Sequence, residues 1–165
     1  MTISDIQKNN PVNPFALITT TKPDGTTNLA AVSWWTFACN RPPMVLICVS
    51  KKGYTGELIQ NTKEFVLNTV DETLAQAAFA CGTCTGRDTD KAGEFNIELE
   101  SIGQMQTKCV KHHCYALACK MEAVYEAGDH LVFAGNVVDM KSRENVRQLY
   151  AAQGYAKLVP VAKPE

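Results

Sequence analysis

Short apolar and β-branched runs, each followed by residues typical of turns, are the feature that most restricts how this chain can fold. The run "FALITTT" at Phe15–Thr21 stops at Pro23-Asp24-Gly25, which supplies the backbone angles of a tight turn. The return arm is "NLAAVSWWTF" at Asn28–Phe37, so we expect a hairpin. The continuous apolar run "MVLICVS" at Met44–Ser50 then predicts a strand buried on both faces.

Two further strand patterns follow a short strand-like run, "EFVLNTV" at Glu64–Val70. The segments "CYALACKMEAVYE" and "HLVFAGNVVDMK" are joined by "AGD", which predicts a second hairpin. Within its first arm, Tyr115, Leu117, Cys119 and Met121 alternate with other residues. This period of two marks one buried strand face.

Three short helices are expected between and after these strands, each preceded by a residue whose side chain can cap it. The expected caps and segments are Thr55 before 56–63, Asp71 before 72–81 and Ser142 before 143–153. Gly82 and Gly154 stand where the second and third would end, and Val146, Leu149 and Tyr150 would form one apolar stripe in the third. Residues 83–111 show no sustained period, which predicts a long, functional loop.

Length and composition favour one domain spanning residues 1–165, because 165 residues with 45% hydrophobic content can bury one substantial core. The predicted class is mainly β with peripheral helices, arranged as a small β-barrel. Sixteen basic against seventeen acidic residues leave a net charge of −1, which disfavours a nucleic-acid partner. The sequence shows neither a leader-like N-terminus nor a long apolar stretch, so we expect no membrane partner and a cytoplasmic protein.

Seven cysteines is an odd count, which in a reducing compartment argues against a disulfide framework. Cys48 and Cys119 lie in strand-like apolar runs and are interpreted as core residues. One alternative is a zinc-binding module, whose candidate ligands are Cys81, Cys84, Cys109, His112, His113 and Cys114. His130 is expected to open a strand. None of the histidines has a readable Ser or Asp partner, so nucleophilic catalysis has no support.

Three motifs in order carry a family resemblance: "PDGTTNLAAVSWW", "NRPPMVLICVSKKGYTGELIQNTKEFVLN" and "CGTCTGRDTDK". With them the chain resembles the flavin reductase-like, FMN-binding split-barrel proteins, and among these the flavoredoxin group. The resemblance implies a Greek-key split β-barrel, a homodimer, and one FMN held noncovalently per subunit. We assign no catalytic acid or base and no metal ligand from the sequence.

The resemblance also assigns cofactor-binding residues to three segments. The segment facing the isoalloxazine and ribityl groups contributes Asn28, Ala30, Ala31, Val32, Ser33 and Trp34. The expected phosphate turn contributes Ser50, Lys51, Lys52 and Thr55, where free backbone N–H groups at a helix start favour an anion. The third segment contributes Cys84, Thr85, Arg87, Asp88 and Lys91.

The third segment fits a phosphate on chemical grounds as well. Gly86 allows close backbone approach, while Arg87 or Lys91 supplies positive charge that Asp88 and Asp90 can orient. Ala92 stands where the family commonly has an aromatic residue, which puts the packing of this loop in doubt.

Two redox functions remain open at this point. The chain could be an FMN-dependent oxidoreductase that accepts hydride from NAD(P)H, or an electron carrier reduced by a protein electron donor without direct use of a nicotinamide. In both, the chemistry belongs to the flavin and the polypeptide supplies binding and electrostatics.

Overall fold

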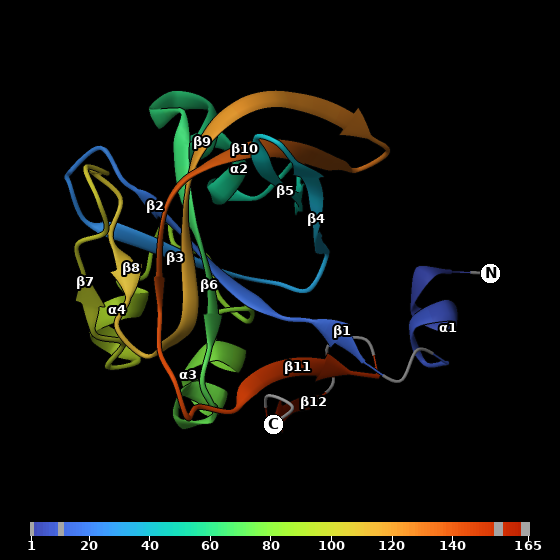
Figure 1. Ribbon diagram of the computed structural model, residues 1–165. Coiled ribbons are helices and arrows are strands. Elements are labelled where there is room, and N and C mark those ends of the chain that lie inside the picture. The colour runs from blue at the N-terminus through green and yellow to red at the C-terminus, as the bar shows by residue number, and fades with distance from the viewer. Residues whose placement is uncertain (1, 10–11, 154–156, 163–165) are drawn as a thin grey trace.

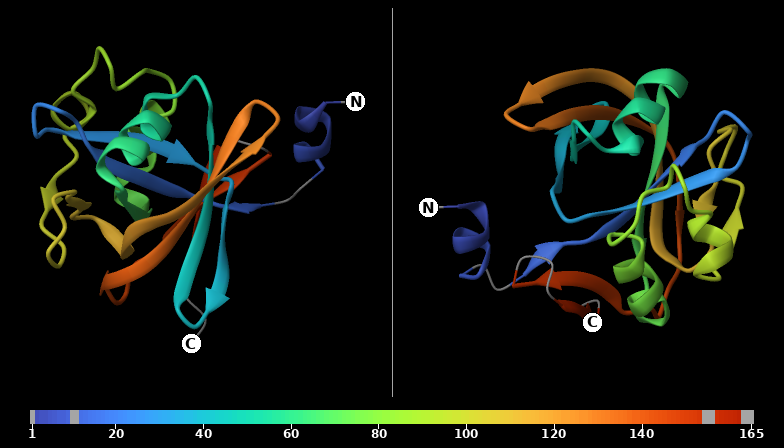
Figure 2. Two further views of the ribbon diagram at one scale, coloured as in Figure 1. Left: turned by 90° about the horizontal axis from the view of Figure 1, so that it is seen from above. Right: turned by 180° about the vertical axis from the view of Figure 1, so that it is seen from behind.

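A seven-stranded antiparallel sheet forms the body of the protein in the computed structural model, which describes residues 2–9, 12–153 and 157–162. Its strands, in spatial order, are β3 (Thr27–Val32), β2 (Ala16–Thr21), β6 (Glu64–Val70), β9 (His113–Ala127), β10 (His130–Ser142), β5 (Pro43–Ser50) and β4 (Trp35–Asn40). The sheet curls so that edge strand β3 comes near β5, as Figures 1 and 2 show. The predicted mainly-β split barrel is confirmed.

Smaller elements surround this sheet. A three-stranded sheet has the order β1 (Asn13–Pro14), β11 (Gln148–Ala152) and β12 (Lys157–Val161), and a two-stranded sheet pairs β7 (Leu99–Glu100) with β8 (Cys109–Val110). The helices are α1 (Ile3–Gln7), α2 (Tyr54–Thr62), η1 (Glu72–Leu74), α3 (Ala75–Ala80) and α4 (Lys91–Glu94). In Figure 1, α1 stands beyond β1, apart from the main sheet. None of the helices described is long and apolar enough to cross a membrane.

The first predicted hairpin is present, but its return arm is not one strand. Gly25 has a φ of +82°, a left-handed value that glycine adopts without steric cost. The expected strand Asn28–Phe37 breaks at Ser33 and Trp34, because β3 and β4 are the two opposite edges of the sheet and the chain must pass between them. The Trp34 carbonyl accepts a hydrogen bond from the Cys48 N–H across this passage.

The prediction that Met44–Ser50 is buried on both faces was wrong. In β5, Val45, Ile47 and Val49 are buried, whereas the residues between them are only partly covered. The strands β2 and β6 are the ones buried on both faces, and β6 packs Phe65 toward the barrel core and Val66 toward the opposite layer. A strand is buried on both faces only where other elements of the protein pack against each face of the sheet.

The second hairpin is confirmed. β9 and β10 pair over their whole length around a turn in which Gly128 has a φ of +58°. Leu117 and Cys119 of the predicted alternating face are buried in the main core cluster, and Tyr115 and Met121 pack against it. Cys48, in contrast, is partly buried and lines a cavity, so its prediction as a core residue was wrong.

The helix predictions had mixed outcomes. Asp71 caps the next helical turn by accepting a hydrogen bond from the Thr73 N–H, as expected, although the turn is η1 followed by α3. Thr55 does not cap α2, since the helix begins one residue earlier, at Tyr54, with Gly53 as its N-cap. Sequence reasoning placed Thr55 at the boundary because its hydroxyl suits a cap.

The helix expected after Ser142 does not exist. Residues Gln148–Ala152 form β11, which pairs with β1 on one side and β12 on the other. Leu149 and Ala151 point into a core cluster beside Phe15 and Leu17, so burial follows a period of two. Partners distant in the sequence therefore overrode the local helical pattern, and Gly154 lies outside the described residues.

Candidate functional site

A cavity of about 620 Å³ opens at the split between β3 and β5, beside the start of α2 and the segment Cys81–Lys91. Its lining includes twelve of the predicted cofactor-binding residues: Asn28, Ala30, Ala31, Val32, Ser33, Trp34, Ser50, Lys52, Thr55, Cys84, Thr85 and Lys91. This volume falls within the range of about 300 to 1,000 Å³ typical of small-molecule sites. Three distant segments of the sequence therefore meet at one cavity.

The first wall is the edge strand β3. Ala30 and Ala31 are partly buried and both line the cavity, and neither side chain is large enough to keep a flat ring from the backbone. Because β3 pairs only with β2 in the sheet, its other edge presents peptide groups toward the split. Such a wall offers apolar surface together with directed hydrogen-bonding groups.

Asn28 fixes the position of the other two segments against β3. Its side-chain nitrogen donates to the hydroxyls of Thr20 and Thr55, each at 3.1 Å, and the residue is buried. A Cβ at Gly86 would stand 1.8 Å from the Asn28 side-chain oxygen, so only glycine permits this contact. The Thr55 hydroxyl therefore accepts a hydrogen bond from Asn28 of β3, and it does not cap α2 as the sequence predicted.

The second wall is the turn that leads into α2. The N-cap Gly53 supplies no side chain to satisfy the first N–H groups of this nine-residue helix. The Lys52 N–H donates to the Ser50 hydroxyl at 3.3 Å, which folds the turn against the strand end. The helix start, which has no side-chain cap, and the exposed Lys52 together favour an anion.

The third wall contains a buried lysine. Lys91 is 4% exposed, and its ammonium donates to the Leu29 carbonyl at 2.8 Å and to the Cys81 carbonyl at 2.7 Å. Burial lowers the pKa of Lys91 from its ordinary value, partly offset by nearby thiols. An ammonium has three donors, so one can still serve a ligand in the cavity that Lys91 lines.

Three predicted residues lie outside the cavity lining: Lys51, Arg87 and Asp88. Lys51 forms an ion pair with Glu126 on the β9–β10 hairpin at 2.6 Å. Arg87 pairs with Glu57 of α2 and stacks 4.4 Å above the centre of the Tyr54 ring. Asp88 and Asp90 were expected to orient the cations of Arg87 and Lys91. Asp88 is exposed, and Asp90 caps α4 by accepting a hydrogen bond from the Gly93 N–H.

The cavity also includes residues that sequence reasoning did not assign to it. His130 lies 4.8 Å from Trp34, ring centre to ring centre, and its Nδ1 is 2.7 Å from an Asp129 carboxylate oxygen. Its strand register places His130 opposite Ser50. That pairing could not be read from the sequence, which predicted only that His130 would open a strand.

The predicted zinc ligands do not come together as one set. Cys81 and Cys84 line the cavity, whereas Cys109 and His113 lie in another region with Glu100. Among the residues described, these last three form the cluster with metal-ligand spacing. The four-ligand zinc site considered from the sequence, in which Cys81 and Cys84 supply two ligands and the other candidates supply the rest, is therefore not supported.

Comparison with known proteins identifies the family. Residues 11–158 match the flavin reductase like domain, and the chain belongs to this family. A relative from Rhodococcus opacus, the reductase component of 4-nitrophenol 4-monooxygenase/4-nitrocatechol 2-monooxygenase, is 27% identical over 143 residues, covering 87% of this chain and 74% of that protein.

Solved structures share the fold. Flavoredoxin of Desulfovibrio vulgaris (Miyazaki F) superposes with a TM-score of 0.85 at 20% identity, covering 93% of this chain and 89% of that one. An FMN-binding protein from Thermus thermophilus gives a TM-score of 0.84 at 18% identity, covering 96% and 91%. The suspected family is confirmed, and with it a flavin-related redox function.

The cavity fits a flavin on structural grounds. A flat ring system needs a wall of small side chains next to free backbone groups, which β3 provides at Ala30 and Ala31. A phosphate needs positive charge and N–H donors, which Lys52 and the start of α2 provide at the same cavity. The donor set therefore matches both ends of a flavin nucleotide.

Proposed function

We propose that this protein binds FMN in the cavity and acts as an FMN-dependent oxidoreductase. The observation that carries the proposal is the meeting, in one cavity, of the open edge of β3 with the uncapped start of α2. A mononucleotide places its single phosphate at the helix start and its ring against the strand. FMN therefore uses both walls without the second nucleotide half that FAD carries.

Bound FMN supplies two-electron chemistry with nicotinamides and one-electron chemistry with other carriers. The polypeptide orients the ring, compensates the phosphate charge and restricts water. Thr55, held by Asn28, places its hydroxyl in the cavity close to the start of α2. Lys91 adds positive charge from beneath β3, where burial makes each electrostatic interaction stronger than in water.

The first experiment is titration of flavin-free protein with FMN, FAD and riboflavin, followed by absorbance. We expect FMN to bind more tightly than riboflavin by about tenfold or more, since a charge-assisted hydrogen bond contributes about 1.5 to 3 kcal/mol. Equal affinity for FMN and riboflavin would contradict the phosphate site. Tighter binding of FAD than FMN would contradict the mononucleotide assignment.

The electron donor is tested on the FMN-loaded protein without oxygen. We expect NADH or NADPH to bleach the flavin absorbance, because His130 and Trp34 line the cavity and offer stacking surface for a second flat ring. Bleaching by a reduced protein donor, with none by either nicotinamide, would contradict the reductase proposal and assign the chain as an electron carrier.

We further propose a homodimer. The large side chains of Phe37, Val138 and Met140 are more than half exposed, and with Met44 they line an apolar groove of about 490 Å³ on β4, β5, β9 and β10. A second copy would remove this apolar surface from water. Light scattering should report a dimer, and Met140→Ser should weaken it. A monomer with full flavin content would contradict the proposal.

A further inference from the structure

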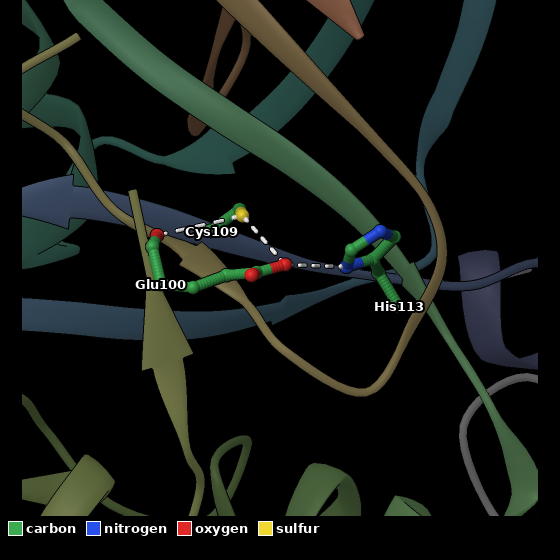
Figure 3. Close-up of side chains that lie close together, drawn as sticks. All are labelled: Glu100, Cys109 and His113. Carbon is green, nitrogen blue, oxygen red and sulfur yellow. Dashed lines mark hydrogen bonds and ion pairs between the residues drawn. The ribbon is translucent and has the colours of Figure 1, made fainter. Parts of the chain in front are cut away.

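A second group of chemically active side chains lies outside the flavin cavity, where the two-stranded sheet β7–β8 meets the start of β9. Figure 3 shows Glu100, Cys109 and His113 converging on one point. Their potential ligand atoms all lie within 4.8 Å of one another. None of the three lines the flavin cavity, so the group has no part in the proposed redox site.

Tertiary pairing creates this cluster. Glu100 of β7 stands directly opposite Cys109 of β8 in the strand register, which puts both side chains at the same level. The Cys109 sulfur is 3.9 Å from Glu100 Oε1, and His113 Nδ1 is 3.8 Å from the same oxygen. One carboxylate oxygen is thus shared between a thiol and an imidazole that follows four residues later.

The environment orients the carboxylate toward the other two groups. Lys141 contacts the second oxygen of Glu100, Oε2, at 3.1 Å. This ion pair leaves Oε1 directed at the sulfur and the imidazole, as an outer-shell partner does for a metal-ligating carboxylate. The Cys109 and His113 side chains are buried, whereas the Glu100 side chain is 35% exposed, so the group opens to solvent on one side.

We propose that Glu100, Cys109 and His113 form a zinc-binding site. A thiolate, an imidazole and a carboxylate are the three ligand types that Zn²⁺ takes, whereas Mg²⁺ and Ca²⁺ prefer oxygen ligands alone. The open side leaves room for water as a fourth ligand. One thiolate and one carboxylate balance the charge of the ion, and the thiol proton passes to solvent when the sulfur binds.

His113 has to change its hydrogen bond for this role. Its Nδ1 lies 2.7 Å from the Val110 carbonyl oxygen, and this hydrogen bond fixes the orientation of the ring. For Nδ1 to bind zinc, the ring proton must reside on Nε2 instead. The imidazole also has to turn away from the Val110 carbonyl, because zinc binds a histidine nitrogen at about 2.0 Å and the 2.7 Å gap between Nδ1 and that oxygen is too short to hold the ion.

The site has a structural consequence. Zinc would link β7 and β8 to β9, and so add to the hydrogen bonds that already hold the segment between α4 and β9 against the main sheet. Figure 1 places β7 and β8 at the side of the sheet, away from α1. Bound zinc should therefore raise the unfolding temperature of the protein.

The test begins with the full chain, treated with a chelator and then titrated with ZnCl₂ by calorimetry. We expect one zinc per chain, retained through gel filtration, and a higher unfolding temperature. Glu100→Gln, at a partly exposed position, and His113→Gln should each weaken binding by about tenfold or more. Cys119→Ser is the matched control, a buried cysteine outside the cluster, and should bind zinc like the parent.

Cobalt keeps the proposal testable if a variant fails to fold. Co²⁺ added to the unchanged chain should give intense bands at longer wavelength than flavin absorbance, together with a sulfur-to-metal charge-transfer band. No saturable binding, or cobalt binding without the sulfur band, would overturn the site. Equal loss of zinc in Cys119→Ser would also overturn it. Flavin content, measured in the same samples, reports separately on the FMN proposal.

Discussion

The two positively charged borders of the cavity are built in opposite ways. The turn Ser50–Gly53 is largely exposed, and its lysines extend from the surface. In the segment Cys81–Lys91, the ammonium of Lys91 is buried and already bonded to two carbonyls. The exposed lysines of the first border are therefore available to bind a ligand. The buried ammonium of the second border stabilises the fold and also lines the cavity.

The contrast extends to neighbouring residues of one motif. Arg87 and Lys91 are four residues apart, yet Arg87 lies on the surface against Glu57 and Tyr54 while Lys91 is buried behind β3. Equal formal charges thus have different physical roles. We therefore expect substitutions in the buried border to lower the stability of the protein, and substitutions in the exposed border to lower its affinity for FMN.

Loss of the buried cation should have the largest effect. Lys91→Met leaves the Leu29 and Cys81 carbonyls without their buried donor, so we expect the free energy of unfolding to fall by about 2 to 4 kcal/mol. Urea titration measures it. Lys52→Met is the control on the exposed border and should change stability by less than about 0.5 kcal/mol. Similar free energies of unfolding for the two variants would contradict the structural role that we assign to Lys91.

A methyl group at Gly86 should have the next largest effect. Gly86→Ala forces the segment away from Asn28, whose side chain is already held by two threonines, and overpacking of this kind costs about 1 to 3 kcal/mol. FMN affinity should fall with it. Gly56→Ala is the matched control, because its Cβ would meet neighbours at 3.4 Å or more. A parent-like Gly86→Ala would show that the close contact is not needed.

Alkaline pH should act on the buried border. Burial raises the pKa of the Cys81 thiol to about 12, above its ordinary value of 9.0. The folded state then keeps a proton that the unfolded chain loses, so the stability this thiol contributes is present below pH 9 and is lost as pH rises toward 12.

The measurement compares urea unfolding of the parent and Cys81→Ala at several pH values between 9 and 12. The parent should lose stability more steeply by about 1.4 kcal/mol per pH unit. The comparison of slopes is needed because burial lowers the pKa of Lys91, which acts in the opposite direction. Equal slopes in the two proteins would show that Cys81 ionises freely in the folded state.

The smallest effects concern affinity at the surface. Lys52→Ala should weaken FMN binding by about fivefold or less, since exposed charges contribute up to about 1 kcal/mol. Arg87→Ala should change it by less than about twofold, because Arg87 does not line the cavity. Flavin titration gives both values, with riboflavin binding as the reference for each. A larger loss in Arg87→Ala than in Lys52→Ala would reverse the assignment of the phosphate border.

Much of this fold follows from local sequence patterns. The period of two at Tyr115–Met121 and the glycine at position 25 determine a strand face and a turn, because both depend on the backbone of neighbouring residues alone. The three motif segments also identified most of the cavity lining. The family resemblance, carried by those motifs, supplied the split barrel that the structure confirms.

Tertiary structure decided the remaining features, because each depends on partners far apart in the chain. Residues 148–152 became a strand once β1 and β12 were available to pair with them, against a local helical pattern. Only the curled sheet buries Lys91 behind Leu29 and leaves Arg87 outside. Likewise, Glu100 meets Cys109 through strand register, and the eight residues between them in the sequence give no sign of that contact.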